Sequence, residues 1–301
     1  MHNSAFLDIG KRSAGEKERK MIQDISPHRL NNHYQEQNPG ESSVCFYVKN
    51  GMMLVKETAG TIAYPPASWD TAGCVYAFSL DEERYFLHLE DLDGEQATRF
   101  EEQGYTWVKP MQFRTLAPRH LAFAGITAMH IRNWYMRNRY CGCCGHATEL
   151  DHRERMVRCP SCGNMVYPRI SPAVIVAVTR GEEILLTKYA GRTYSKYALI
   201  AGYTEVGETA EETVAREVME EAGLKVKNIR YYKSQPWGFS ETLLLGFFCE
   251  VDGSDEIRMD EEELAVAQWV RRDEIETVQE SFDDISLTNE MICLFRDGNT
   301  L

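Results

Sequence analysis

The chain has 301 residues, of which 43% are hydrophobic and 26% are charged, a composition typical of a folded globular protein with about two domains. Its formal net charge of −13 argues against a protein that binds nucleic acid mainly through the phosphate backbone. No apolar run of about 18 residues occurs, so we expect no membrane span. The N-terminus lacks the apolar core of a secretory leader, and we expect a cytoplasmic protein.

The first part of the chain divides into a polar segment and a β-rich domain. Residues 1–40 are rich in charged, Asn and Gln residues, and we expect them to be flexible. Residues 41–115 contain apolar runs on both sides of Asn50-Gly51, which predicts a hairpin, and a similar pattern surrounds Asp81–Glu83. A short helix is expected near 94–104. His88 is expected to be a strand-face residue and not a ligand.

Residues 116–138 have the apolar spacing of a long connector helix. The apolar positions are Leu121, Phe123, Ala124, Ala128, Ile131, Trp134 and Tyr135. So broad an apolar face predicts packing between domains or between subunits, and a homodimer is one interpretation. For the arginines of this helix we favour a solvated face over an RNA contact.

Residues 139–167 carry two Cys-x-x-Cys pairs, Cys141/Cys144 and Cys159/Cys162. Two such pairs are the usual way in which a short ribbon supplies four thiolates to a structural Zn²⁺. Cys143 is an alternative to Cys141, His146 is a weaker candidate ligand, and a site without metal is the remaining interpretation. Outside the ribbon, the cysteines are expected to be plain buried thiols of a reducing compartment: Cys45, Cys74, Cys249 and Cys293.

Residues 168–301 alternate strands with a central and a terminal helix. Apolar runs turn at residues 180–182 and again around Gly238, and a further strand is expected over 265–270. Helices are expected from about Ala210 and over 285–297. Mixed strands with two such helices predict an α-β-α sandwich, preceded by the ribbon and the sheet-rich N-terminal domain.

The segment 202–224 carries the strongest chemical signal. Thr209 and Glu212 form a capping-box pattern that begins the helix. One face of this helix carries Glu217, Glu220 and Glu221. Because these three carboxylates repel one another, we expect a cation to bind there. Carboxylate oxygens suit Mg²⁺ or Mn²⁺. The competing interpretation is an acidic face exposed to water.

The spacing of this segment resembles the Nudix box at every fixed position. The matching residues are Gly202, Glu208, Arg216, Glu217, Glu220, Glu221 and Gly223. The resemblance implies a hydrolase of nucleoside diphosphates linked to another group. It assigns metal binding to Glu217 and Glu221, catalysis to Glu220 and Glu221 (with Glu220 as metal ligand or general base), and further ligands to the Ala201 carbonyl and Glu263. It gives Gly202, Glu208, Arg216 and Gly223 structural roles.

Residues Ser234–Trp237 and Phe239 resemble the SQPW signature of NADH pyrophosphatases, a branch that includes NAD-cap-removing RNA hydrolases. Gly238 and Ser240 replace prolines of the signature, which predicts a looser loop. The resemblance implies cleavage of NADH or NAD⁺ to nicotinamide mononucleotide and AMP, and also a homodimer. Alternatives are removal of the NAD cap from RNA, hydrolysis of ADP-ribose or other dinucleotides, and an inactive binding module.

The same resemblance suggests substrate contacts. Tyr167 and Tyr203 would stack on a base, and Gln235 and Glu241 would bond the nicotinamide or ribose, whereas Trp237 would be packing. A basic strip is the sequence feature that would guide RNA. Its members are Arg132, Arg137, Arg139, Arg153, Arg155 and Arg158.

Overall fold

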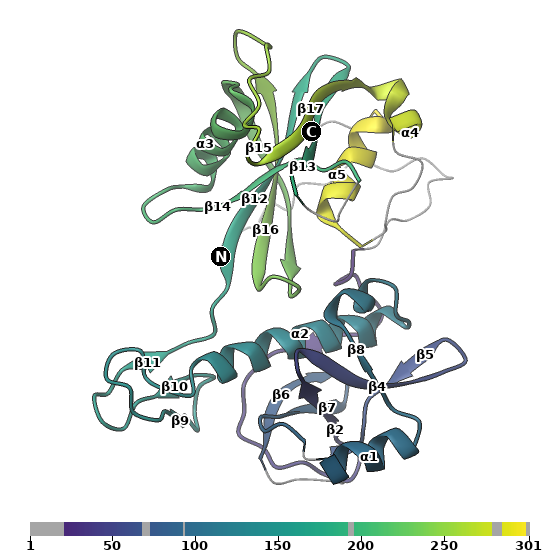
Figure 1. Ribbon diagram of the computed structural model, residues 1–301, viewed down its shortest axis with the longest axis vertical. Helices are drawn as coiled ribbons and strands as arrows, with labels where there is room; N and C mark the ends of the chain where they lie inside the picture. Colours follow the sequence, from purple (N-terminus) through teal and green to yellow (C-terminus); the bar gives the residue numbers. More distant parts are fainter. Residues whose placement is uncertain (1–20, 68–72, 93, 192–195, 279–284, 299–301) are drawn as a thin grey trace, which may run out of the picture.

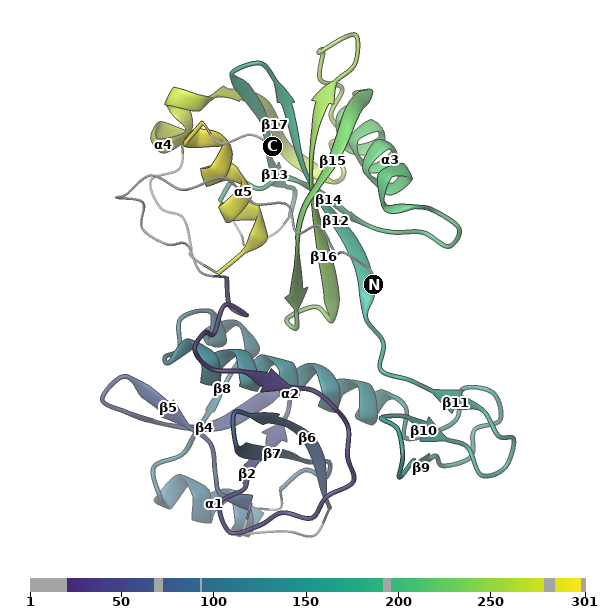
Figure 2. The ribbon, with the colours of Figure 1, turned by 180° about the vertical axis from the view of Figure 1, so that it is seen from behind.

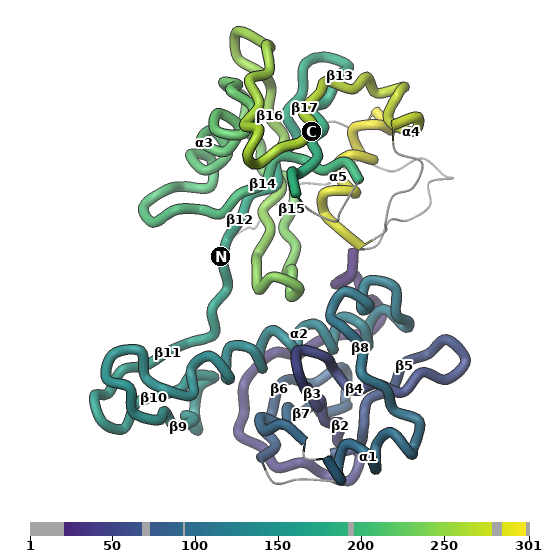
Figure 3. The backbone as a smooth tube through the Cα atoms, viewed as in Figure 1, coloured from purple at the N-terminus to yellow at the C-terminus, as the bar shows by residue number. Residues whose placement is uncertain are grey.

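The computed structural model describes residues 21–67, 73–92, 94–191, 196–278 and 285–298. The chain forms an N-terminal lobe, a ribbon at one side of it and a C-terminal lobe above it (Figure 1). The tube in Figure 3 traces the single connection from the ribbon up into the C-terminal lobe.

Two small four-stranded sheets build the N-terminal lobe. One has the order β1 (Leu30–Asn31), β6 (Cys74–Leu80), β7 (Glu83–His88) and β2 (Val44–Phe46). The other runs from β3 (Val48–Lys49) through β4 (Met52–Thr58) to β5 (Thr61–Ala63), with β8 (Thr106–Val108) beside β4. The hairpin expected at Asn50-Gly51 is confirmed, since both residues have positive φ, 51° and 72°. The short helix is α1 (Gly94–Glu102).

The described part of the N-terminal segment differs from the flexible stretch that its polarity suggested. Met21 packs into the apolar core of the C-terminal lobe, whereas Ile22 and Ile25 pack into that of the N-terminal lobe. Strand β1 also pairs with β6. A few apolar side chains therefore anchor a segment whose composition is polar. The expectation for residues 1–20 lies outside the described residues.

The connector helix is confirmed as α2 (Arg119–Arg137), which follows the 3-10 turn η2 (Pro110–Arg114). Trp134 and Tyr135 are buried in the core of the N-terminal lobe. The apolar face is thus covered within the chain, which removes the basis for expecting a subunit interface there. Among the described helices, none is long and apolar enough to cross a membrane.

The ribbon is a three-stranded antiparallel sheet, β11 (Met165–Val166), β10 (Val157–Arg158) and β9 (Glu149–Leu150). Segment 30–37 ties it to the N-terminal lobe: Tyr34 Oη donates to the Asp151 carbonyl at 3.1 Å. Arg155 Nη1 donates to Asn32 Oδ1 at 2.6 Å and its guanidinium also bonds the Ala77 carbonyl.

The C-terminal lobe contains a mixed sheet between two helices. Its strand order is β15 (Val226–Trp237), β16 (Thr242–Val251), β12 (Ser171–Arg180), β13 (Glu183–Tyr189) and β17 (Leu264–Arg271), with β14 (Ile200–Tyr203) paired to β12. Within this sheet β12 and β16 run parallel to each other, and the other strand pairs are antiparallel. A 3-10 turn, η3 (Arg272–Glu274), and a short helix, α4 (Ile275–Val278), follow β17.

Alternate residues of β12 explain how the sheet is covered on both faces. Val174 and Val176 pack with Val214 of α3 (Ala210–Ala222), and Ile175 packs with Met291 of α5 (Leu287–Arg296). Successive strand residues point to opposite faces, so α3 and α5 lie on opposite sides of the sheet (Figure 1). The expected α-β-α sandwich is confirmed.

Candidate active site and zinc ribbon

Helix α3 begins where the capping pattern predicts. The Thr209 hydroxyl accepts a bond from the Glu212 N–H, and the Glu212 carboxylate accepts one from the Thr209 N–H, so the capping box is formed. The helix ends at Gly223, which has a φ of 69° that favours glycine. These caps fix the helix that carries the acidic face.

Arg216 is the hub of the acidic site. Its Nε and Nη2 bond both oxygens of Glu208, at 2.6 and 2.9 Å, and Nη2 also donates to the Tyr203 carbonyl at 2.9 Å. Its Nη1 donates to Glu217 at 2.7 Å and to Glu220 at 3.0 Å. Arg216 lowers the pKa of Glu208 to about 2. This geometry suits the structural role expected for Arg216 and Glu208.

The three helix carboxylates differ in exposure. Glu221 is only 2% exposed and Glu217 is buried, whereas the Glu220 side chain is 59% exposed. Burial raises the pKa of Glu217 against the lowering effect of Arg216, and the charges of Glu220 and Glu263 raise it further. The Glu263 carbonyl accepts a bond from the Ala190 N–H at 2.9 Å, which holds this residue beside the end of β13.

Gly202 brings strand β14 against this helix. A Cβ at Gly202 would lie within 2.2 Å of all three carboxyl atoms of Glu217. The preceding residue, Ala201, pairs with Ile175 of β12, and this strand pairing holds the Ala201 backbone in place. Gly202 therefore allows β14 to lie directly against the Glu217 side chain.

The acidic residues fit a hard divalent cation. Two buried carboxylates and one exposed carboxylate offer only oxygen donors, and Arg216 bonds two of them, Glu217 and Glu220. Their donor atoms are less tightly gathered than those of the ribbon. Within the described ranges, the only group of three or more metal-type ligands with donor atoms within 4.8 Å of one another is the cysteine set. Which glutamates bind metal thus remains a prediction.

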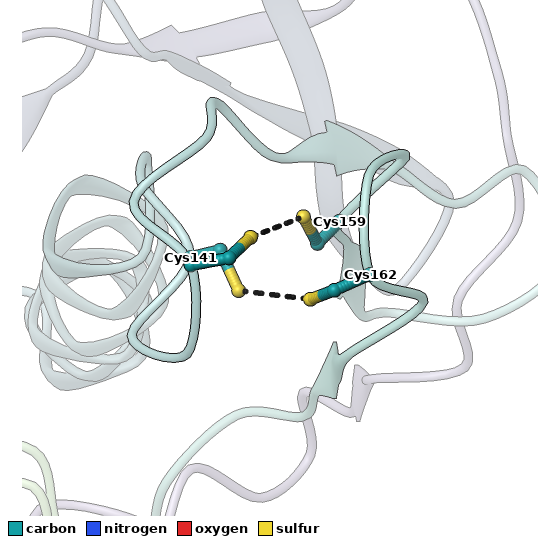
Figure 4. A group of neighbouring side chains, drawn as sticks. Cys141, Cys159 and Cys162 are labelled. Carbon is teal, nitrogen blue, oxygen red and sulfur yellow. Dashed lines mark hydrogen bonds between the residues drawn. The ribbon is translucent and has the colours of Figure 1, made fainter.

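The four expected ribbon cysteines converge. Cys141 Sγ lies 3.6 Å from Cys162 Sγ, and Cys144 Sγ lies 3.4 Å from Cys159 Sγ (Figure 4). A tetrahedral Zn²⁺ about 2.3 Å from each sulfur would leave the sulfurs about 3.8 Å apart, so the group fits a structural zinc. Neither Cys143 nor His146 belongs to it. Backbone N–H groups of Cys143 and Cys144 lower the pKa of Cys141 to about 6, whereas bonds to the neighbouring thiols outweigh the Asn164 N–H and raise the pKa of Cys162 to about 12.

The two tyrosines expected to stack are both exposed, but they lie on different parts of the chain. Tyr203, on β14, is 53% exposed, and its hydroxyl is 3.5 Å from Thr242 Oγ1. Tyr167 follows β11, and its hydroxyl donates to Glu154 of the ribbon at 2.8 Å. Strands β11 and β14 are well separated in both ribbon views (Figures 1 and 2).

Gln235 does not face a substrate in this structure, contrary to the expectation. It is 0% exposed, and its Nε2 donates to Gln23 Oε1 at 3.0 Å and to the Ile285 carbonyl at 2.8 Å. Its Oε1 accepts from the Leu287 N–H at 2.8 Å. Gln235 therefore cross-links β15, the start of α5 and the N-terminal segment.

Glu241 also differs from its expected role as a substrate contact. One of its oxygens accepts from Asn133 Nδ2 at 3.2 Å and the other from Arg137 Nη1 at 2.5 Å. Both donors belong to α2. Neither Asn133 nor Gln23 was singled out from sequence, because partners about a hundred or more positions apart leave no local pattern.

The basic strip is interrupted. Arg132 is buried and paired with Asp91 at 2.7 Å, and Arg155 is bound to the N-terminal lobe. Arg137 is paired with Glu241. Arg158 also lies 3.9 Å from Asp151, so four of the six arginines make contacts within the chain, which weakens the expected path for RNA.

Comparisons with known proteins match both C-terminal parts. Residues 169–289 match the NUDIX domain, and residues 137–167 match the NADH pyrophosphatase zinc ribbon domain. The chain is 43% identical over 147 residues to the NAD-capped RNA hydrolase NudC of Escherichia coli O1:K1 / APEC and of strain SMS-3-5. The match covers 49% of this chain and 57% of each relative, so the chain spans little more than half of their length. A NUDIX hydrolase from Nitrosomonas europaea is 20% identical, with a TM-score of 0.44 over 53% of this chain and 91% of that one.

Proposed function

We propose that the chain hydrolyses the pyrophosphate bond of NADH or NAD⁺, because residues 137–167 match the NADH pyrophosphatase zinc ribbon domain and residues 169–289 match the NUDIX domain. The products are nicotinamide mononucleotide and AMP. The observation that carries the proposal is the acidic site built around Arg216, with Glu217 and Glu221 buried and Glu220 open to water.

The proposed cofactor is Mg²⁺ or Mn²⁺, held by Glu217, Glu221 and the Ala201 carbonyl, with Glu220 and Glu263 as further ligands. When bound, such ions neutralise pyrophosphate charge and lower the pKa of the attacking water. Glu220 is the carboxylate best placed to accept the proton of that water, because it is the most exposed of the three. Arg216 keeps the carboxylates oriented while the substrate binds.

Tyr203 is the proposed platform for a substrate ring, since its side chain is exposed on the strand that also carries Ala201. Tyr167 would contribute to the same site only from a second copy of the chain. Exposed apolar side chains on and around the ribbon support a homodimer through that region: Tyr140, Leu150, Met165, Tyr167 and Ile170. Light scattering coupled to size exclusion tests the dimer, and a monomer over the whole concentration range contradicts it.

The two Cys-x-x-Cys pairs come together as a metal-type group, which supports a reducing compartment and hence the cytoplasm. Removal of the NAD cap from RNA is the second candidate function. The observation that favours it is the 43% identity to bacterial NAD-capped RNA hydrolases. The interrupted basic strip, in contrast, favours a small substrate over RNA.

The test is a comparison of kcat/KM with Mg²⁺ or Mn²⁺ for NADH, NAD⁺, ADP-ribose, diadenosine polyphosphates and NAD-capped RNA. We expect NADH to exceed ADP-ribose. A preference for ADP-ribose contradicts the proposal, and a preference for the capped RNA over NADH selects the second candidate.

A further inference from the structure

The turn between β15 and β16, residues 237–241, which we call the hairpin tip, is docked on the N-terminal lobe. Figures 1 and 2 show the hairpin reaching down to α2 in both views. Trp237 and Phe239 pack against the apolar core of that lobe, and the Arg114 guanidinium lies 5.2 Å from the Trp237 ring centre. The tip is therefore held by residues outside the C-terminal lobe.

Gly238 permits this contact. A Cβ at Gly238 would lie 2.9 Å from the Ile126 carbonyl oxygen of α2, closer than real Cβ contacts occur. A larger residue at this position would push the hairpin tip away from the helix. At the position where the signature has proline, Gly238 thus allows close packing against α2. These contacts hold the loop in place, whereas the sequence predicted a looser loop.

Glu241 fastens the other side of the hairpin tip. It is a non-glycine residue with a φ of 60°, a costly conformation that persists only where the surroundings impose it. Asn133 and Arg137 of α2 bond its two carboxylate oxygens. The Glu241 carbonyl accepts from the Ser171 N–H at 2.9 Å, and His130 Nε2 donates to the Arg169 carbonyl at 2.8 Å. Helix α2 therefore also fixes the approach to β12.

The hairpin tip leads directly to the proposed substrate platform. Thr242 follows Glu241, is buried, and has its hydroxyl 3.5 Å from the Tyr203 hydroxyl. The Thr242 hydroxyl is also 2.8 Å from Ser240 Oγ. A shift of the hairpin tip would move Thr242. Because Thr242 is a neighbour that restrains the exposed Tyr203 side chain, the shift would also affect Tyr203.

We propose that α2 of the N-terminal lobe, through Asn133 and Arg137 on Glu241 and through Ile126 on Gly238, positions the hairpin tip and thereby the Tyr203 platform for the nucleotide substrate. Arg137 and Glu241 are positioning residues, which act through Thr242 and do not touch the reacting atoms. The part concerning substrate rests on the proposed hydrolase function; the part concerning Tyr203 does not.

The first test measures kinetics of the full-length protein with NADH. Arg137→Ala should raise KM about threefold to tenfold with kcat within about twofold, because one charge-assisted hydrogen bond is lost at a distance from the chemistry. Arg137→Lys should recover part of the loss. Arg99→Ala is the control, since Arg99 is an exposed residue of α1 in the same lobe and has no part in the proposed site. An unchanged KM in Arg137→Ala, or an equal change in Arg99→Ala, overturns the substrate part.

The second test is independent of substrate. Amide hydrogen exchange of the same variants should rise in residues 238–244 and in β14 for Arg137→Ala, and stay as in the wild type for Arg99→Ala. Gly238→Ala, which perturbs the same contact sterically, should give the same pattern. Unaltered exchange in β14 overturns the positioning role even if NADH is a substrate. If the wild type cleaves no NADH while the exchange pattern appears, the proposed function fails and the positioning of Tyr203 stands.

Discussion

Gly202 and Glu217 are in direct contact: a Cβ at Gly202 would lie 1.9 Å from the Glu217 carboxyl carbon. No side chain fits between β14 and α3 at this point, so even alanine must displace the carboxylate. The contact places the Glu217 oxygens beside the backbone of the strand that carries Ala201, where the proposed metal would sit.

We therefore expect Gly202→Ala to lower kcat/KM for NADH by about 100-fold or more, since a misplaced ligand costs transition-state stabilisation. Circular dichroism should show a folded protein. Gly94→Ala is the control, because a Cβ there meets no atom within 4 Å. Wild-type activity of Gly202→Ala would mean that Glu217 is not needed where it lies.

Glu221→Gln tests the most buried carboxylate of the helix. The substitution keeps the shape of the side chain but removes its charge, and we expect turnover to fall by at least about 100-fold while the fold is retained. Glu211→Gln, an exposed residue in the first turn of the same helix, should retain activity. Comparable activity in the two variants would move the metal role away from Glu221.

Several features of the N-terminal lobe, the ribbon and the C-terminal lobe could be predicted because their signals are local. The capping box at Thr209, the turn at Asn50-Gly51 and the cysteine spacing each lie within a short stretch of sequence, and the structure contains all three. The face shared by Glu217 and Glu221 follows from helix periodicity alone.

The failures concern long-range contacts. Gln235 looked free to bind substrate, but its partners Gln23 and Ile285 are 212 and 50 positions away. Arg155 looked like part of a basic surface, but it bonds Asn32 and Ala77 across the lobe boundary. Such pairings depend on how the lobes dock, which residue patterns do not encode locally.

Stability in acid should depend on Glu208. Arg216 lowers the pKa of this carboxyl from 4.5 to about 2 in the folded protein. A depressed pKa contributes stability that is present above the unfolded value, and that is lost as pH falls from about 4.5 towards about 2. Glu208→Gln should therefore be less stable than the wild type at pH about 6, and the gap should narrow as pH falls. Urea unfolding midpoints over this range measure it; a gap independent of pH contradicts the ion pair as the cause.

Zinc analysis distinguishes the cysteine set that the structure brings together from its alternative. Purified protein should retain about one zinc per chain after dialysis, because four thiolates close the coordination shell. Cys159→Ala and Cys141→Ala should lose it and unfold the ribbon, whereas Cys143→Ala should keep it, since the Cys143 side chain is exposed and outside the group. If Cys143→Ala lost the zinc while Cys141→Ala kept it, Cys143 would be the ligand in place of Cys141. Absence of zinc from the wild type would contradict the zinc prediction, even though the four sulfur atoms lie within 4.8 Å of one another.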